Sequence, residues 1–142
     1  MMSRIGTACG LALIAATACP ALAQPQASLT VTGTDYGPSA TLAGVYFTNF
    51  ENSVFTECAG EQACKDWAAK GGAWVNCTPA ACADLEARIK ALNGNSDNWG
   101  SFAIKFVGRH AKAKHPKRFL NDREDGVLIE RILEFRLIKG QG

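Results

Sequence analysis

Four of the six cysteines in this chain lie between positions 58 and 82, and their redox state limits the folds open to it. The N-terminus indicates whether the cysteines meet oxidising or reducing conditions. Residues 1–23 resemble a secretory leader, with a positive charge at Arg4, an uncharged apolar run from Ile5 to Ala18 and the small-residue cleavage site Ala21-Leu22-Ala23. Exported chains meet oxidising conditions, so we expect the four cysteines that remain after cleavage to form two disulfides.

Two other interpretations of this leader compete. In Ala16-Thr17-Ala18-Cys19, Cys19 would carry a lipid anchor, but the large aliphatic residue usual three positions before such a cysteine is missing. A membrane-spanning helix needs about 20 apolar residues, and this run is shorter.

The composition, 47% hydrophobic with a net charge of +2, excludes a disordered chain. We predict a signal peptide over residues 1–23, a single domain over 24–142 and a periplasmic or secreted protein.

The four remaining cysteines, Cys58, Cys64, Cys77 and Cys82, allow three pairings. Thr78 is a good helix N-cap and Pro79 a good first helical residue. Cys77 and Cys82 then take the two positions that a hydrophobic staple brings into contact. We therefore prefer Cys77 with Cys82 and Cys58 with Cys64. No Cys-x-x-Cys redox motif is present, and only one pair has the spacing typical of structural zinc, so we expect no metal.

Patterns with a period of two and helical patterns alternate along the chain. Strands are predicted at Ser28–Thr32, Leu42–Phe50, Val54–Cys58, Ala73–Asn76, Trp99–Arg109 and Val127–Lys139. Helices are predicted from Gly60 to Gly71 and from Thr78-Pro79 to Asn93-Gly94-Asn95. In the second helix Leu85, Ile89 and Leu92 fall at helical spacing.

The last strand carries an apolar row on one face. The row comprises Val127, Ile129, Leu133, Phe135 and Leu137. Arg131 interrupts it, which predicts a bulge there or a strand end that faces solvent. Long bent strands suit small closed barrels. We therefore expect a mainly β (α+β) fold, a small OB-like five-stranded barrel with two short helices and two disulfides.

The segment from Gly44 to Cys58, with its tyrosine, Phe-Glu-Asn-Ser run and final cysteine, resembles the opening of small bacterial envelope proteins with an OB-type barrel. A tryptophan and a helix follow this segment, and then come the strands Phe102–Arg109 and Val127–Arg136. This layout is similar to the C-terminal domain of NlpE-type envelope lipoproteins. The resemblance implies the barrel and an envelope location, and it covers about the last hundred residues. The chain departs from this pattern at 117–120, where a Gly-Tyr-Gly-His-type loop is common, and in its three later cysteines.

A basic run gives the strongest functional indication. Its positive residues, with no acid among them, are Lys105, Arg109, Lys112, Lys114, Lys117 and Arg118. Such a field attracts anions, so we expect a binding module that contacts an anionic envelope component or an envelope protein. A solvated loop without function is the simpler alternative. Because Phe102 and Phe106 are expected in the core, we do not expect nucleic acid to bind.

Catalysis is less well supported than binding. His110 and His115 lie in the basic run, where positive charge disfavours a second cation. The familiar hydrolase, metalloprotease and nucleotide-binding motifs are missing, so we expect no enzyme, no catalytic residue and no cofactor. The alternatives are a small hydrolase that pairs either histidine with Asp122 or Glu124, and an inhibitor or accessory subunit of another envelope protein. Trp67, Trp74 and Trp99 could form a surface that stacks on carbohydrate, but we expect them to pack over the disulfides.

Overall fold

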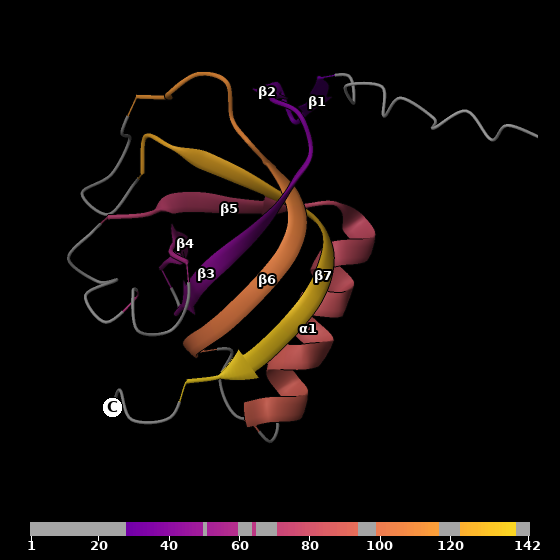
Figure 1. Cartoon of the computed structure of the whole chain (residues 1–142), viewed down its shortest axis with the longest axis vertical. Coiled ribbons are helices and arrows are strands. Elements are labelled where there is room, and N and C mark those ends of the chain that lie inside the picture. The colour runs from indigo at the N-terminus through magenta and orange to yellow at the C-terminus, as the bar shows by residue number, and fades with distance from the viewer. Residues whose placement is uncertain are drawn as a thin grey trace, which may run out of the picture.

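The structure is a computed structural model that describes residues 28–49, 51–59, 64, 71–93, 99–116 and 123–138. Its elements, in chain order, are β1 (Leu29–Val31), β2 (Thr34–Tyr36), β3 (Ala40–Thr48), β4 (Ser53–Glu57), β5 (Ala73–Cys77), α1 (Pro79–Asn93), β6 (Gly100–His110) and β7 (Gly126–Leu137). Five strands close into a barrel in the order β3-β4-β5-β7-β6 (Figure 1). Neighbouring strands are antiparallel except β5 and β7, which are parallel.

The predicted fold class is confirmed, because the protein is mainly β with a closed five-stranded barrel. The described residues contain one helix, α1, where two were predicted. The range predicted for the other helix, Gly60–Gly71, lies outside the described residues except for Cys64 and Gly71. Helix α1 begins at Pro79, as its N-cap signal indicated, and packs along β7 on one side of the barrel (Figure 1).

The bulge predicted near Arg131 is confirmed. Because of this bulge, the apolar face predicted for the last strand is wrong beyond Arg131. The register between β6 and β7 shifts on both sides of Arg131, because Val107 pairs with Arg131 while Gly108 pairs with Ile129. An extra residue reverses the faces that follow it. Ile132 therefore points into the core, and Leu133, which was expected there, is 38% exposed.

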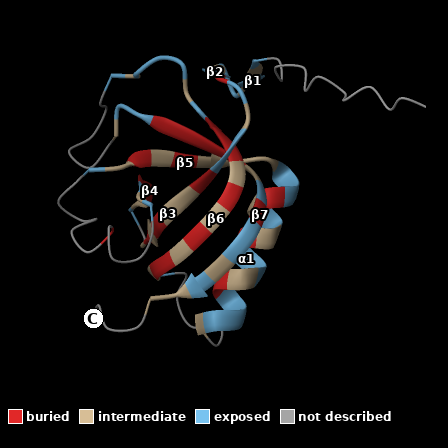
Figure 2. Ribbon diagram, in the orientation of Figure 1, coloured by how far each residue is buried: buried red, intermediate tan, exposed pale blue. Residues whose placement is uncertain are grey.

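The barrel interior is filled by side chains from every wall. Phe102, Ile104 and Phe106 of β6 are buried in the core cluster, which confirms the interpretation of both phenylalanines as core residues. Phe106 meets Phe55 of β4 edge to face, with ring centroids 4.9 Å apart. Buried and partly buried residues alternate along β6 in Figure 2. The interior is thus a packed core, so ligands must bind at the ends or the outer surface of the barrel.

Helix α1 covers the barrel with one face only. Leu85 and Ile89 are buried, as the helical pattern predicted, and Ala81, one turn before Leu85, is buried with them. Leu92, the third residue expected on this side, is exposed at the last turn of α1.

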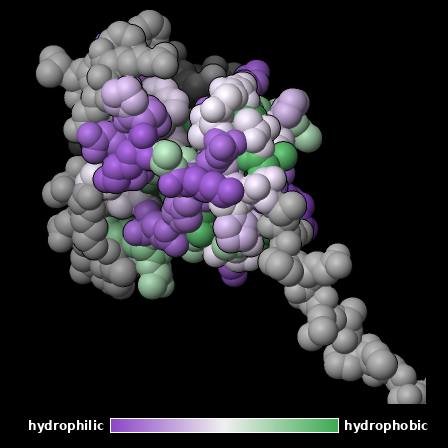
Figure 3. Space-filling model, turned by 90° about the horizontal axis from the view of Figure 1, so that it is seen from above, coloured by the Kyte–Doolittle hydropathy of each residue, from purple (hydrophilic) through white to green (hydrophobic). Residues whose placement is uncertain are grey.

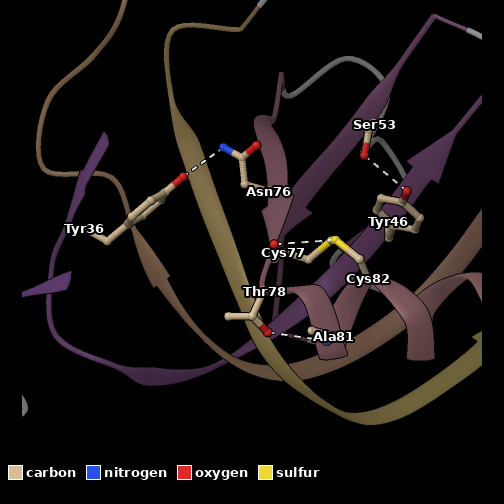
Figure 4. The surroundings of a disulfide bond; sticks show 8 residues. All are labelled: Tyr36, Tyr46, Ser53, Asn76, Cys77, Thr78, Ala81 and Cys82. Carbon is tan, nitrogen blue, oxygen red and sulfur yellow. Dashed lines mark hydrogen bonds between the residues drawn. A yellow bond between two sulfur atoms is a disulfide. The ribbon is translucent and has the colours of Figure 1, made fainter. Parts of the chain in front are cut away.

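The N-terminal hairpin of β1 and β2 packs outside the barrel. The strand predicted at Ser28–Thr32 is observed as Leu29–Val31, but β2 was missed, since Tyr36-Gly37 was interpreted as a break. Residues Thr32 and Gly33 have φ angles of 48° and 79° and form the tight turn between the two strands. Tyr36 is fully buried, and its Oη accepts a hydrogen bond from Asn76 Nδ2 at 2.8 Å (Figure 4).

The predicted disulfide pairing is confirmed. Cys77 and Cys82 are joined across the start of α1 with their Cα atoms 5.3 Å apart, and Cys58 and Cys64 are joined with Cα atoms 5.6 Å apart. The Ala81 N–H donates to the Thr78 hydroxyl at 3.4 Å, as expected of an N-cap (Figure 4). The disulfide therefore fixes the helix start to the end of β5.

Candidate functional site

The basic run lies at the end of β6 and in the loop from β6 to β7. This loop reaches one end of the barrel, where the N-terminal hairpin also lies (Figure 1). Figure 3 views this end from above, and hydrophilic residues cover much of its described part. The described residues of the loop are 111–116 and 123–125. Lys117 and Arg118, two of the six predicted binding residues, lie outside them.

Arg109 is buried and serves the fold. Its side chain is about 9% exposed; Nε donates to Glu130 Oε1 at 2.8 Å, and Nη1 donates to the Gly37 carbonyl at 3.1 Å. Ser39 Oγ donates to the other Glu130 oxygen at 2.7 Å. The guanidinium therefore attaches the N-terminal segment to β7, and it is not available at the surface to an anion.

The other described cations of the basic run lie in two places, one on the barrel wall and two in the loop. Lys105 lies on the outer wall of the barrel, where its Nζ is 3.2 Å from Glu134 Oε1. Lys114 belongs to the loop, with Nζ 3.9 Å from a Glu124 oxygen and 3.6 Å from an Asp125 oxygen. Lys112 is exposed. The structure thus brings Lys112 and Lys114 to the same loop, and it places Lys105 and Arg109 elsewhere.

A cleft of about 360 Å³ opens beside this loop. Phe55 lines it together with glycines 71 and 72 at the start of β5, and charged side chains line the remainder. These charged and ionisable residues are Glu57, His110, Arg123, Glu124 and Asp125. The carboxylates offset the nearby positive charges, so the cleft has mixed charge, and the loop adds the exposed Lys112 and Lys114 beside it.

His110 has a partner that the sequence did not indicate. Its Nε2 lies 3.1 Å from Glu57 Oε2, and both side chains are 53% exposed at the rim of the cleft. The alternative of a small hydrolase paired either histidine with Asp122 or Glu124. Asp122 lies outside the described residues, and Glu124 meets His115 through the backbone, where the His115 N–H donates to the Glu124 carbonyl at 3.0 Å. Glu57 was missed because no sequence pattern relates the end of β4 to the end of β6.

A metal centre has no support in the part of the chain that the structure describes. None of its clusters combines three or more histidine, cysteine, aspartate or glutamate side chains suited to a metal ion. The four cysteines that the structure describes are joined in two pairs, so these four offer no thiolate to a metal or a substrate.

A second pocket, of about 500 Å³, opens at the opposite end of the barrel. Trp99 lines it and is 55% exposed, whereas Trp74 on β5 is half-buried. Trp67 lies outside the described residues. Trp99 therefore does not have the packed position that we expected for the tryptophans.

No helix in the described ranges combines the length and the apolar character that crossing a membrane requires. Comparison of the chain with protein-family models, with curated proteins and with solved structures finds no match. The likeness to NlpE-type domains therefore stays a prediction.

Proposed function

We propose that this protein is an exported, non-catalytic binding module with an OB-type barrel, which contacts an anionic component of the cell envelope through its β6–β7 loop. The observation that carries the proposal is the position of this loop. It presents exposed lysines beside an open cleft, at one end of a barrel whose interior is filled.

The topology supports the OB-type assignment. OB-type domains are five-stranded Greek-key barrels that bind ligands with one sheet face and the loops after the first and fourth strands. Here β3, β4, β5, β6 and β7 would be strands one to five, with α1 between the third and the fourth. The β6–β7 loop is then the loop after the fourth strand, a position that such barrels use for binding.

Export is supported by the leader and the two disulfides. Disulfides persist in the periplasm and outside the cell but are rare in the cytosol. Both pairs close short loops that stabilise the barrel without any thiol chemistry. A periplasmic or secreted protein fits both features.

Binding to an anionic surface is testable by charge removal. The variant carries Lys112→Ser, Lys114→Ser, Lys117→Ser and Arg118→Ser. The control removes four positive charges elsewhere, three exposed and one half-buried at Arg88, through Arg88→Ser, Lys90→Ser, Arg131→Ser and Arg136→Ser. Co-sedimentation with phosphatidylglycerol-containing vesicles is the measurement. We expect the wild type and the control to sediment and the loop variant to stay in solution.

Salt provides the second criterion, since exposed charges are screened within about 10 Å at 0.1 M salt. Wild-type sedimentation should decrease steadily as the salt concentration rises. Equal sedimentation of the loop variant and the wild type, or binding that salt does not change, contradicts the proposal.

A second candidate function rests on the His110–Glu57 pair. Glu57 could orient the imidazole through Nε2, so that Nδ1 accepts a proton from an attacking water, as in a small hydrolase. The matched comparison is His110→Ala against His115→Ala, with nitrophenyl esters as substrates. Turnover that His110→Ala abolishes and His115→Ala retains supports this function. Activity that is absent, or equal in both variants, rejects it for these substrates.

A further inference from the structure

Trp99 is the most exposed of the large apolar side chains in the described part of the chain, at 55%. It precedes β6 directly, and the Asn93 Nδ2 group at the end of α1 donates to its carbonyl at 2.8 Å. The backbone of Trp99 is thus attached to the helix while its side chain meets solvent. Because the backbone from which the indole projects is fixed, only the two side-chain torsions of Trp99 must be ordered when a ligand packs on it.

The pocket beside Trp99 combines this apolar surface with polar groups. It lies between the β3–β4 turn and the start of β6, and Thr48, Asn49, Glu51 and Ser101 also line it. Its volume of about 500 Å³ lies within the range of about 300–1,000 Å³ that is usual for small-ligand sites. A ligand here would meet one aromatic face and several hydrogen-bonding groups.

Asn49 is fixed in place by its own turn. Its Oδ1 accepts hydrogen bonds from the Glu51 N–H at 3.0 Å and from the Asn52 N–H at 2.7 Å. Asn52 Nδ2 also donates to this oxygen, at 2.9 Å. Among the described residues, the Asn49 Nδ2 group has no partner, so its two N–H donors remain for a ligand. The β3–β4 turn therefore presents fixed donors next to the exposed Glu51 carboxylate.

The geometry points to a saccharide-binding site at this end of the barrel, with Trp99 as the stacking surface. A pyranose ring has an apolar C–H face that packs on an indole and hydroxyl groups at its rim. Those hydroxyls both donate and accept hydrogen bonds, so they suit the Asn49 amide and the Glu51 carboxylate together. Trp side chains combine a large apolar face with low flexibility, which suits this role.

The charge of the pocket selects neutral sugars. Glu51 is the one charged residue among the described residues that line it, and a carboxylate repels an anionic ligand. The site therefore differs in chemistry from the basic β6–β7 loop at the other end of the barrel. It extends the proposed function and does not depend on it.

The test titrates the mature protein with neutral trisaccharides, namely chitotriose, cellotriose and maltotriose, by calorimetry and tryptophan fluorescence. We expect at least one trisaccharide to bind saturably, and Trp99→Ala to weaken its affinity about tenfold or more while Trp99→Tyr retains most of it. Leu133→Ala, which removes another exposed apolar side chain, on β7 and outside the residues that line the pocket, should bind like the wild type. Circular dichroism establishes that each variant is folded.

Two outcomes would overturn the site: no saturable binding of any trisaccharide up to about 10 mM, or equal affinities of Trp99→Ala and the wild type. The loop variant with four lysine and arginine substitutions should bind the trisaccharide normally. Trp99→Ala should likewise sediment normally with anionic vesicles. The saccharide site and the anion-binding loop can therefore fail or succeed independently of each other in these experiments.

Discussion

At the scale of single residues, the side chain of Arg109 joins three segments that are far apart in sequence. It contacts Glu130 on β7 and the Gly37 carbonyl in the segment after β2, from its own position near the end of β6. Its place in a basic run suggested a ligand contact, but burial gives it a structural role. A charge that stays away from water after it has lost its partner is costly, so Glu130 depends on Arg109.

Replacing Arg109 should destabilise the fold. We expect Arg109→Ala to lower the free energy of unfolding by about 2–3 kcal/mol, because Glu130 and the Gly37 carbonyl lose their partner. Lys105→Ala, which breaks an exposed pair with Glu134, should cost about 1 kcal/mol or less. Urea denaturation measures both. Equal losses in the two variants would contradict the structural role of Arg109.

Gly44 is a second residue whose identity the packing requires. A Cβ atom at this position would overlap the Thr56 carbonyl oxygen on β4. We expect Gly44→Ala to cost at least about 2 kcal/mol, since two backbones must separate. Gly37→Ala is the control, because its Cβ would lie 3.6 Å from the His110 oxygen, an ordinary contact. Thermal unfolding should show a loss for Gly44→Ala and little change for Gly37→Ala.

At the scale of elements, α1 is attached to the barrel at its first turn and along one face. The Cys77–Cys82 disulfide and the Thr78 cap hold its start, while Leu85 and Ile89 pack inward. The helix is short, and isolated helices of this length are marginal in water. Its stability therefore comes from these attachments and not from its own hydrogen bonds.

Removal of this disulfide should loosen the helix start. The double variant Cys77→Ala, Cys82→Ala should lose about 2 kcal/mol of stability by the loop-entropy estimate. Thr78→Ala, which keeps the disulfide and removes the cap, should lose about 1 kcal/mol. Denaturation under non-reducing conditions compares them. A double variant as stable as the wild type would show that the disulfide contributes nothing to the free energy of unfolding.

At the scale of the whole molecule, a closed barrel with a packed interior leaves its two ends and its outer surface for binding. One end carries the basic loop and the mixed-charge cleft, and the other carries the Trp99 pocket. Barrel closure also removes exposed sheet edges, which protects the strands from pairing with other chains. The two proposed sites therefore lie at chemically different ends of the barrel.

The compartment sets the covalent state of the whole chain. We expect protein recovered from the periplasm or the medium to begin at Gln24 and to show no free thiols before reduction, because both cysteine pairs are joined. N-terminal mass spectrometry and thiol titration check this. A chain that begins at a lipid-modified Cys19, or that has titratable native thiols, would contradict the proposed maturation.

Local sequence was sufficient for several features. The Thr78-Pro79 signal predicted both the start of α1 and the Cys77–Cys82 disulfide. Both features involve only residues within about two helical turns of one another. Alternation in β6 identified Phe102, Ile104 and Phe106 as core residues, because side chains of a strand point alternately to its two faces. In each case the residues that decide the outcome are close together in the chain.

Features that depend on long-range register were decided by the tertiary structure. The sequence indicated a bulge near Arg131, but only its pairing with β6 shows that Ile132 points inward in place of Leu133. The His110–Glu57 pair and the burial of Arg109 likewise join strands that the sequence does not relate. The sequence by itself determined α1, the five barrel strands and the apolar face of β6. Barrel closure decided which polar groups meet, because a shift of one residue in register changes every contact across a strand.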